Sequence, residues 1–527
     1  MSLSFPTMAA IRFGYGLRPG EAPPQTKDDL IAQVTRGAGS VPGFPVGGIE
    51  ARRAALLDLQ DRLKQIRQAD GDDLDRRQQR RLLQRRAQML FQMDANARLM
   101  QAVLSPDGFN ERLATFWTNH FSTSAAKSLP MRLIVPLYEA EAIRPYMGGK
   151  FATLLRSATE HPSMLIYLDQ AQSLGPGSQG GMRRNKGLNE NLGRELLELH
   201  TLGAGSGYTQ ADVRSAAMVL TGLTVDYKEL ETAFRPQISE PGRHEVLGVS
   251  YGGAKRRRED YLAMLDDLAA NPKTAEHISR KLSVHFISDQ PPQDLIAAMS
   301  EAWKKTDGEL SAVYRAMLDH PAAWRDEGAK ARQPFDYIVT GLRALNSGAG
   351  AGDVAAFMQA YQQEDGDGDE MMAVTATKDA GSDRRSPDAQ APNTEAPDAR
   401  SPDAPAMNAP PSLDDEAKIK RRKAFQMARA LGQGALRRMG QPTWLPPSPA
   451  GFEESFSAWI TASQLSERLS WARRASAQFG KDADPREFLK ATLADAARDE
   501  TIRVVSQAPN KISGLTLVLA SPEFNRR

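Results

Sequence analysis

The most informative absence in this 527-residue chain is cysteine, of which it has none. Without thiols, the protein forms no disulfide bond and has no thiolate for nucleophilic catalysis. The same absence excludes zinc ribbons and cysteine-ligated iron–sulfur clusters. It does not indicate a compartment, because a chain of this length buries a core large enough to fold without disulfides.

Long apolar runs and a strong net charge are also missing. No stretch approaches the roughly 18 uninterrupted apolar residues that predict a membrane helix, so we expect no membrane association. The N-terminal sequence lacks the basic start and apolar run of a signal peptide. We therefore expect a cytoplasmic protein, with a periplasmic location left open if the start codon is mis-assigned. The formal net charge is only +2, which gives no global attraction to nucleic acid.

Short motifs for familiar catalytic chemistry are absent as well. The sequence has no G-x-S-x-G nucleophile elbow, no H-E-x-x-H zinc motif and no P-loop lysine. Its seven histidines are scattered, and no set of them has the spacing of zinc ligands. We therefore predict no metal site, and the cofactor stays unknown.

Apolar residues at three- and four-residue spacing predict a mainly α protein. We expect one helical body in two parts, with residues 413–527 packing on residues 1–346. Residues 233–253 interrupt the helices with Pro, Gly and short apolar pieces, which indicates a loop or small β-hairpin. Residues 347–412 are rich in Pro, Ala, Asp and Ser. This composition buries too little apolar surface to offset its ordering entropy, so it predicts a disordered insertion.

The densest basic run, "DRRQQRRLLQRR", covers residues 75–86. It places Arg77, Arg81 and Arg85 four apart on one flank of a helix. A solvated helix face explains the run better than nucleic-acid binding does, because no aromatic residue is interleaved for base stacking.

A histidine followed by proline ends two amphipathic segments, at His161 and His320. Proline starts a new helix readily, and the residue before it is pushed out of the α region. The pattern therefore favours a helix boundary over a role for either histidine in chemistry.

The stretch "NENLGRELLELHTLG", residues 189–203, carries polar groups among leucines. Glu195 falls within the apolar sector of a helical wheel, with Asn191 and Glu198 just beyond it and Arg194 farther out. A buried carboxylate is costly unless it is paired or hydrogen-bonded. A structural network between helices and a carboxylate pair that acts as acid and base both stay open. The leucines on the face that the wheel buries are Leu188, Leu192, Leu196, Leu199 and Leu202.

A second polar cluster is "FWTNHF", residues 116–121. On a helix, His120 shares a side with Phe116, whereas Asn119 faces away. A histidine among aromatic residues is more often a satisfied core residue than a ligand. If this helix meets the first strip in the fold, His120 and Glu195 would form a base and the group that orients it.

Together these motifs resemble those of a large bacterial family called domain of unknown function 1800. The resemblance rests on "FWTNHFSTS", "HPSMLIYLD", "NENLGRELLELHTLGAGSGYTQ", "RQPFDYIVTGLRAL" and "PPSPAGF", in the family's order and over nearly the whole chain. It implies a mainly α-helical fold and brings no established activity. Genes of the family often lie beside those of domain of unknown function 1501, which looks like sulfatases. The resemblance therefore implies a sulfatase-like partner.

The characteristic residues of the family map onto both polar clusters. Family members often have a histidine where this chain has Ser239, and His244 lies a few residues away. If that histidine is functional in the family, this protein has lost or replaced it. The matching positions are Trp117, Asn119, His120, Phe121, Asn189, Glu190, Asn191, Arg194, Glu195, Glu198, Leu199, Thr201, Gly203, Tyr208 and Thr209.

Two hypotheses about function follow from the sequence. The first is an uncharacterised enzyme of hydrolytic type, with a polar pocket between helices. Its catalytic residues would be His120, Glu195 and Glu198, and its binding residues Asn119, Asn191 and Arg194. The second is a non-catalytic helical scaffold that binds a sulfatase-like protein.

Overall fold

The computed structural model describes residues 3–69, 73–184, 187–325, 330–346 and 425–527, with the single positions 354 and 423. The insertion predicted at 347–412 lies outside the described residues, apart from Val354. The described chain is mainly α-helical with two small antiparallel sheets, so the predicted fold class is confirmed.

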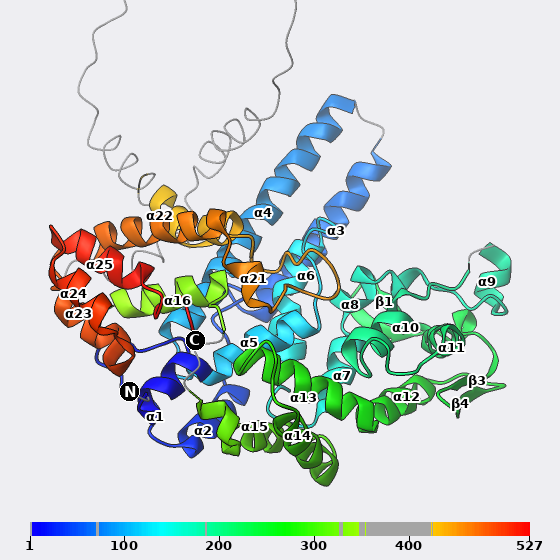
Figure 1. The fold of residues 1–527 in the computed structure, drawn as a ribbon. Coiled ribbons are helices and arrows are strands. Elements are labelled where there is room, and N and C mark those ends of the chain that lie inside the picture. Colours follow the sequence, from blue (N-terminus) through cyan, green and yellow to red (C-terminus); the bar gives the residue numbers. More distant parts are fainter. Residues whose placement is uncertain are drawn as a thin grey trace, which may run out of the picture.

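Before the insertion, the helices build a body with α5 near its middle (Figure 1). They are α1 (Phe5–Met8), α2 (Lys27–Ala38), α3 (Ile49–Gln68), α4 (Asp73–Leu104), α5 (Gly108–His120), α6 (Met131–Tyr138), α7 (Phe151–Glu160), α8 (Pro162–Tyr167), α9 (Gln179–Arg184), α10 (Asn191–Glu195), α11 (Gln210–Leu220), α12 (Arg258–Ala270), α13 (Pro272–Phe286), α14 (Gln293–Thr306), α15 (Leu310–Asp319) and α16 (Pro334–Leu345).

The helices after the insertion gather around α16, which is buried along its whole length. Its residue Gly341 lets α22 approach, because a Cβ at this position would come within 2.4 Å of the Trp471 ring. Tyr337 of α16 also packs on Trp471, with ring centroids 5.3 Å apart. These later helices are α20 (Gln433–Arg438), α21 (Phe456–Trp459), α22 (Ala462–Phe479), α23 (Pro485–Leu493), α24 (Asp499–Ser506) and α25 (Lys511–Ala520).

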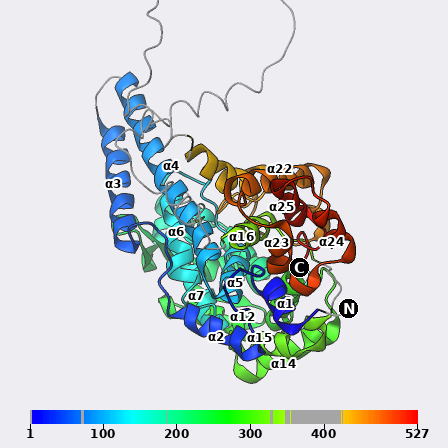
Figure 2. The ribbon, with the colours of Figure 1, turned by 90° about the vertical axis from the view of Figure 1, so that its left-hand side faces the viewer.

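Helices α3 and α4 form an antiparallel pair whose tip projects from the body (Figures 1 and 2). Arg77, Arg81 and Arg85 are exposed on this arm, as the solvated-face interpretation predicts. Within the described residues, no helix is both long enough and apolar enough to cross a bilayer.

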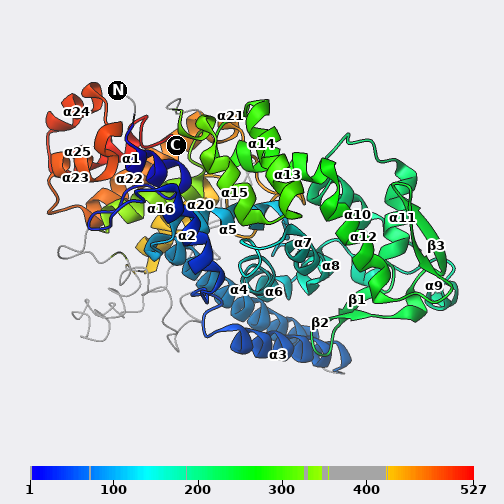
Figure 3. The ribbon, with the colours of Figure 1, turned by 90° about the horizontal axis from the view of Figure 1, so that it is seen from below.

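The two small sheets lie at the end of the molecule opposite α23–α25 (Figure 3). Strand β1 (Leu223–Asp226) pairs with β2 (Glu231–Phe234), and β3 (Gly242–Val246) pairs with β4 (Val249–Gly253). The β-hairpin alternative predicted for 233–253 is therefore confirmed, and a first hairpin precedes it.

Within the described residues, three π-helical segments interrupt the regular helices, namely η1 (Ala9–Phe13), η2 (Glu139–Ile143) and η4 (Leu196–His200). The wider turn of η4 rotates the side chains that follow Glu195. Leu197 is fully buried as a result, whereas Leu199 is partly exposed. The wheel at 100° per residue was wrong here, because it placed Leu199 on the buried face.

The helix boundaries predicted at the two His-Pro pairs are confirmed. The Nδ1 atom of His161 accepts the amide of Ser163 at the start of α8, at 3.1 Å. His320 accepts the amide of Ala322 in the same way, at 3.2 Å. Each imidazole therefore satisfies one of the orphan amides of a helix start.

Candidate functional site

A pocket lies where the loop of residues 441–454 meets the C-terminal half of α5. The cavity has a volume of ≈ 50 Å³, which holds a few waters or a small ligand group. We call it the loop pocket. Its lining residues come from α4, α5, the segment just after α5, α13, the start of α16 and the loop, and are Arg98, Thr115, Thr118, Asn119, Ser122, Thr123, His285, Gln333, Phe335, Gln441, Pro442, Thr443, Trp444, Pro446, Phe452 and Glu454.

Asn119 fastens the loop to α5. Its Nδ2 donates to the carbonyl of Phe452 at 3.0 Å, and its Oδ1 accepts the amide of Phe452 at 2.7 Å. Gly451 (φ +84°) makes room for this contact, because a Cβ there would lie 2.5 Å from the Asn119 carbonyl oxygen. Two of the motifs, "FWTNHF" and "PPSPAGF", therefore meet directly although 333 residues separate the bonded positions.

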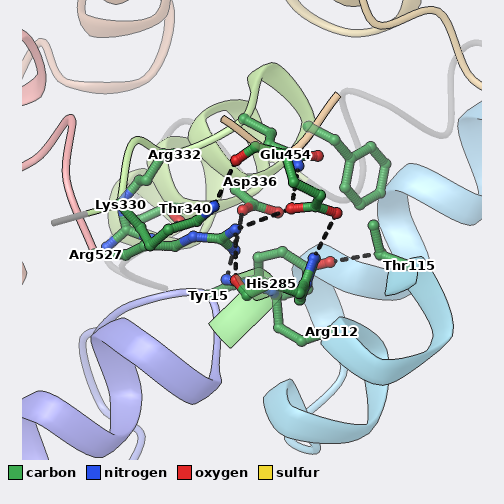
Figure 4. Close-up of polar contacts among 12 residues, drawn as sticks. Tyr15, Arg112, Thr115, His285, Lys330, Arg332, Asp336, Thr340, Glu454 and Arg527 are labelled. Carbon is green, nitrogen blue, oxygen red and sulfur yellow. Dashed lines mark hydrogen bonds and ion pairs between the residues drawn. The ribbon is translucent and has the colours of Figure 1, made fainter. Parts of the chain in front are cut away.

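Glu454 and His285 both line the loop pocket and contact each other (Figure 4). Glu454 Oε1 lies 2.8 Å from His285 Nδ1, and Glu454 Oε2 accepts Gln333 Nε2 at 2.9 Å. Arg112 Nη2 lies 3.2 Å from His285 Nε2. Because arginine only donates, His285 Nε2 must accept, and the ring proton sits on Nδ1 and points at Glu454. Both ring nitrogens of His285 are therefore occupied, which leaves Glu454 as the group with lone pairs to spare.

Burial opposes ionisation of Glu454, but His285, Lys330 and Arg112 hold the pKa of this carboxyl below its ordinary value. Glu454 is therefore a carboxylate at neutral pH. It is also partly open to the loop pocket, since 19% of its side chain is exposed.

Positive charge is in excess behind this carboxylate. Asp336 pairs with Arg527 at 2.6 Å and with Arg112 at 3.4 Å, and the buried Arg332 and Arg468 also lie in its field. The guanidinium groups of Arg112, Arg332 and Arg527 thus lie around two carboxylates, Asp336 and Glu454 (Figure 4), and Arg468 adds a fourth positive charge. Burial lowers the pKa of Arg332 and of Arg468 to about 10. Such a surplus in a low-dielectric core attracts an anionic group.

The loop pocket is lined by donors that are not all used within the described residues. The hydroxyls of Thr118 and Thr443 are buried and make no hydrogen bond within the described residues. In the same part of the chain, the one hydrogen bond of the Arg98 guanidinium runs from Nε to Glu139 Oε2, at 2.6 Å. Its plane packs on the Phe335 ring, 4.7 Å from the centroid. An unpaired buried donor costs about 1–3 kcal/mol, so these groups favour a bound ligand or water.

One family model matches nearly the whole chain. The family model described as Protein of unknown function (DUF1800) matches residues 8–526. The chain belongs to this family. Neither the curated proteins nor the solved structures give a match.

The family motif that contains His120 places this histidine in the core. It is 2% exposed and stacks on Phe116, with ring centroids 6.1 Å apart. Its Nε2 lies 3.2 Å from the carbonyl oxygen of His200. Burial, with the charges of Lys281 and the neighbouring histidines, lowers the pKa of His120 well below its ordinary value. His120 is therefore a neutral imidazole among aromatic rings, which is the surrounding of a core histidine.

The other DUF1800 motif keeps its carboxylates on a partly exposed face. Burial and the charge of Glu198 raise the pKa of Glu195, while Glu198 accepts the hydroxyl of Tyr208 at 3.0 Å. Arg194 donates to Gln210 at 3.0 Å, and Asn191 is exposed.

The predicted catalytic residues do not bond to one another in this fold. Among the described residues, no hydrogen bond or ion pair joins His120 to Glu195 or Glu198. Of the six predicted site residues, Asn119 alone lines the loop pocket. No group of three or more His, Asp or Glu in the described chain has the arrangement of a metal site. Ser239 is buried and donates to the carbonyl of Arg235 at 3.3 Å.

Sequence reasoning missed residues that line the loop pocket. His285 and Glu454 lie 169 residues apart, and His285 ends a helix that reads as ordinary amphipathic sequence. The "PPSPAGF" motif could have indicated Glu454, because Glu453 and Glu454 directly follow this motif in the sequence.

Proposed function

We propose that the protein is a hydrolytic enzyme whose active site is the loop pocket, and that its substrate is an ester of a small anionic acid. One observation carries the proposal. An oriented, ionised carboxylate, Glu454, shares a pocket with the hydroxyls of Thr118 and Thr443 and with the terminal nitrogens of Arg98, which make no hydrogen bond within the described residues. Binding sites combine a few convergent polar groups with apolar walls in this way.

Glu454 is the group that would accept a proton from water. A carboxylate offers about four lone-pair positions, and His285 and Gln333 use two of them. The proton would pass from water to Glu454 and then to the departing alcohol oxygen, while the water oxygen bonds to the acid. Because its pKa is low, Glu454 is a weak base, so the proposal assigns it general base catalysis of about 10²–10⁴-fold at most.

The anionic part of the substrate follows from the positive surroundings. Arg98 would donate to the anion with its terminal nitrogens, and the hydroxyls of Thr118 and Thr443 would donate to the oxygen that gains charge. Donors fixed before the reaction stabilise such charge without reorganisation. The arginine surplus around Asp336 adds to the same field.

Hydrolysis of p-nitrophenyl esters tests this proposal. The panel contains the acetate, succinate, phosphate and sulfate esters, and we expect turnover of an ester whose acid part is anionic. The variant Glu454→Gln should lose at least about 100-fold in kcat. Glu453→Gln is the matched control, since Glu453 is the exposed neighbour and lines no part of the loop pocket. Turnover of no ester, or equal turnover by Glu454→Gln, would contradict the proposal.

The catalytic residues predicted from the sequence, His120, Glu195 and Glu198, remain a separate prediction. The variant Glu195→Ala tests it, because loss of turnover in a folded variant would locate the reaction at the "NENLGRELLELH" motif. We expect Glu195→Ala to keep its turnover, since Glu195 does not line the loop pocket.

A second candidate function is a scaffold, and the projecting arm favours it. Arg77, Arg81 and Arg85 are exposed there and have no ion pair within the described residues. A partner with an acidic surface would fit this stripe, and the sulfatase-like family named above supplies the candidate. Pull-down with that protein at low and high salt tests the idea. Retention that Arg81→Glu abolishes would support it, and absence of binding at low salt would refute it.

A further inference from the structure

A second and larger cavity opens on the other side of η2. Its volume is ≈ 440 Å³, which is enough for a ligand of several rings or residues. Its walls come from the base of α3, η2, the junction of α7 with α8, β2 and α12. The π-helical segment η2 separates the two cavities, because its Glu139 holds Arg98 of the loop pocket and its Glu141 faces the second cavity. We call this cavity the hairpin groove.

The first polar group of the hairpin groove is centred on Glu141. Arg53 donates to its two oxygens at 3.1 and 3.0 Å in a fork, and His161 Nε2 lies 3.3 Å from Oε2. Because His161 Nδ1 accepts the amide of Ser163, its proton is on Nε2 and points at Glu141. Burial opposes ionisation of Glu141, but His161 and Arg53 lower the pKa of this carboxyl. Glu141 is thus a fixed carboxylate.

The second polar group is centred on Glu160, one residue before His161. Its Oε1 accepts Tyr261 at 2.6 Å and Arg258 at 2.6 and 3.0 Å. No hydrogen bond in the described chain reaches Oε2 of Glu160, and this atom is not enclosed by protein. Burial and the adjacent Glu160 raise the pKa of the Tyr261 phenol. One oxygen of Glu160 is thus immobilised while the other is free to accept.

The charges of the hairpin groove select against simple ions. Two arginines, Arg53 and Arg258, stand against three glutamates, Glu141, Glu160 and Glu231, which leaves one net negative charge. An anion would be repelled, and the guanidinium groups between the carboxylates would oppose a polycation. In each polar group, guanidinium donors lie directly beside carboxylate acceptors, Arg53 at Glu141 and Arg258 at Glu160.

A hydroxyl group is the ligand feature that fits donors and acceptors placed side by side. Each hydroxyl donates one hydrogen bond and accepts two, so it can bond a carboxylate oxygen and a guanidinium nitrogen at once. The partly exposed ring of Phe234 adds an apolar surface and packs against the buried ring of Tyr261, with centroids 5.9 Å apart. A sugar offers hydroxyls on its rim and C–H groups on its faces. We propose that the hairpin groove is a binding site for a neutral oligosaccharide.

Titration calorimetry of the full chain with defined sugars tests the proposal. The probes are cellotriose, maltotriose and tri-N-acetylchitotriose, with spermidine and citrate as charged counterparts. We expect one of the three sugars to bind with a dissociation constant in the millimolar range or better. Glu160→Gln should weaken this binding at least about tenfold, because a hydrogen bond to a charged group is replaced by one to a neutral amide. Glu259→Gln, an exposed glutamate of α12 outside the groove, should bind as the wild type does.

A second variant distinguishes a loss of sugar binding from a loss of the folded structure. Ala233→Trp, on β2, fills the hairpin groove without removing any hydrogen bond, and it should abolish sugar binding. Three results would overturn the proposal: no sugar binds, binding survives in Ala233→Trp, or spermidine binds more tightly than every sugar.

Discussion

The contact between Asn119 and Phe452 gives the sharpest prediction about how the loop pocket is held together. The variant Asn119→Ala removes one bond to the amide and one bond to the carbonyl of Phe452, at 2.7 and 3.0 Å. Each bond contributes about 1 kcal/mol net. We therefore expect the loop of residues 441–454 to open more easily by about 2 kcal/mol.

Amide hydrogen exchange measures this opening directly. The Phe452 amide is the group that Asn119 Oδ1 protects, and about 2 kcal/mol corresponds to about 30-fold faster exchange. Asn510→Ala is the matched control. It removes a similar side-chain bond to the amide of Ser513 at the start of α25, so Phe452 exchange should not change.

The charge variant Asn119→Asp adds a pH signature. Its new carboxylate would face the Phe452 carbonyl oxygen, which only the protonated acid can bond. The folded state therefore raises the pKa of the new carboxyl above its unfolded value of about 3.9. Stability is then present at acid pH and falls as pH rises through the raised pKa. Exchange at Phe452 that stays within threefold of wild type in both variants would refute the reasoning.

Three further predictions concern stability. Burial lowers the pKa of His200 to about 3 in the folded protein. As the pH falls below about 6.5, His200 of the unfolded chain therefore binds a proton before His200 of the folded chain does. Acid should thus destabilise the wild type more than His200→Gln in urea titrations. Arg527→Gln should cost about 3 kcal/mol in urea unfolding, because it leaves the buried Asp336 with the longer Arg112 contact alone. Gly451→Ala should cost more than about 1 kcal/mol, because φ is +84° and its Cβ would overlap a carbonyl oxygen.

Two matched variants separate these effects from general damage. Arg526→Gln changes the exposed neighbour of Arg527, and Gly205→Ala changes a glycine with φ +72° and open space around it. Gly205→Ala therefore measures backbone strain without a clash. If either control loses as much stability as its partner, the buried pair or the close approach is not the cause. An identical pH dependence for His200→Gln and wild type would contradict the assignment to His200.

Local patterns predicted the local structure well. The two His-Pro boundaries and the β-hairpin within residues 233–253 depend on contacts within a few residues, and the structure shows them. Asn119 also faces away from His120, as the helix geometry requires, and its partner is the loop.

The candidate site could not be predicted because its members come from distant segments. His285, Gln333 and Glu454 meet through packing of α13, the start of α16 and the loop, and no local spacing records that packing. A π-helical segment such as η4 also breaks the 100° rule on which a wheel depends. The family resemblance pointed to the right motifs but not to the cavity between them.

The proposed active site is tested most directly by removing its unpartnered hydroxyls. Thr118→Val and Thr443→Val keep the volume of each side chain and break no hydrogen bond of the described protein. With an ester that the wild type hydrolyses, we predict that each variant keeps or gains stability and loses at least about tenfold in kcat/KM. Thr492→Val, which removes an equally unpartnered hydroxyl outside the loop pocket, should keep its turnover. Unchanged kcat/KM in both pocket variants would contradict the assignment of the loop pocket as the active site.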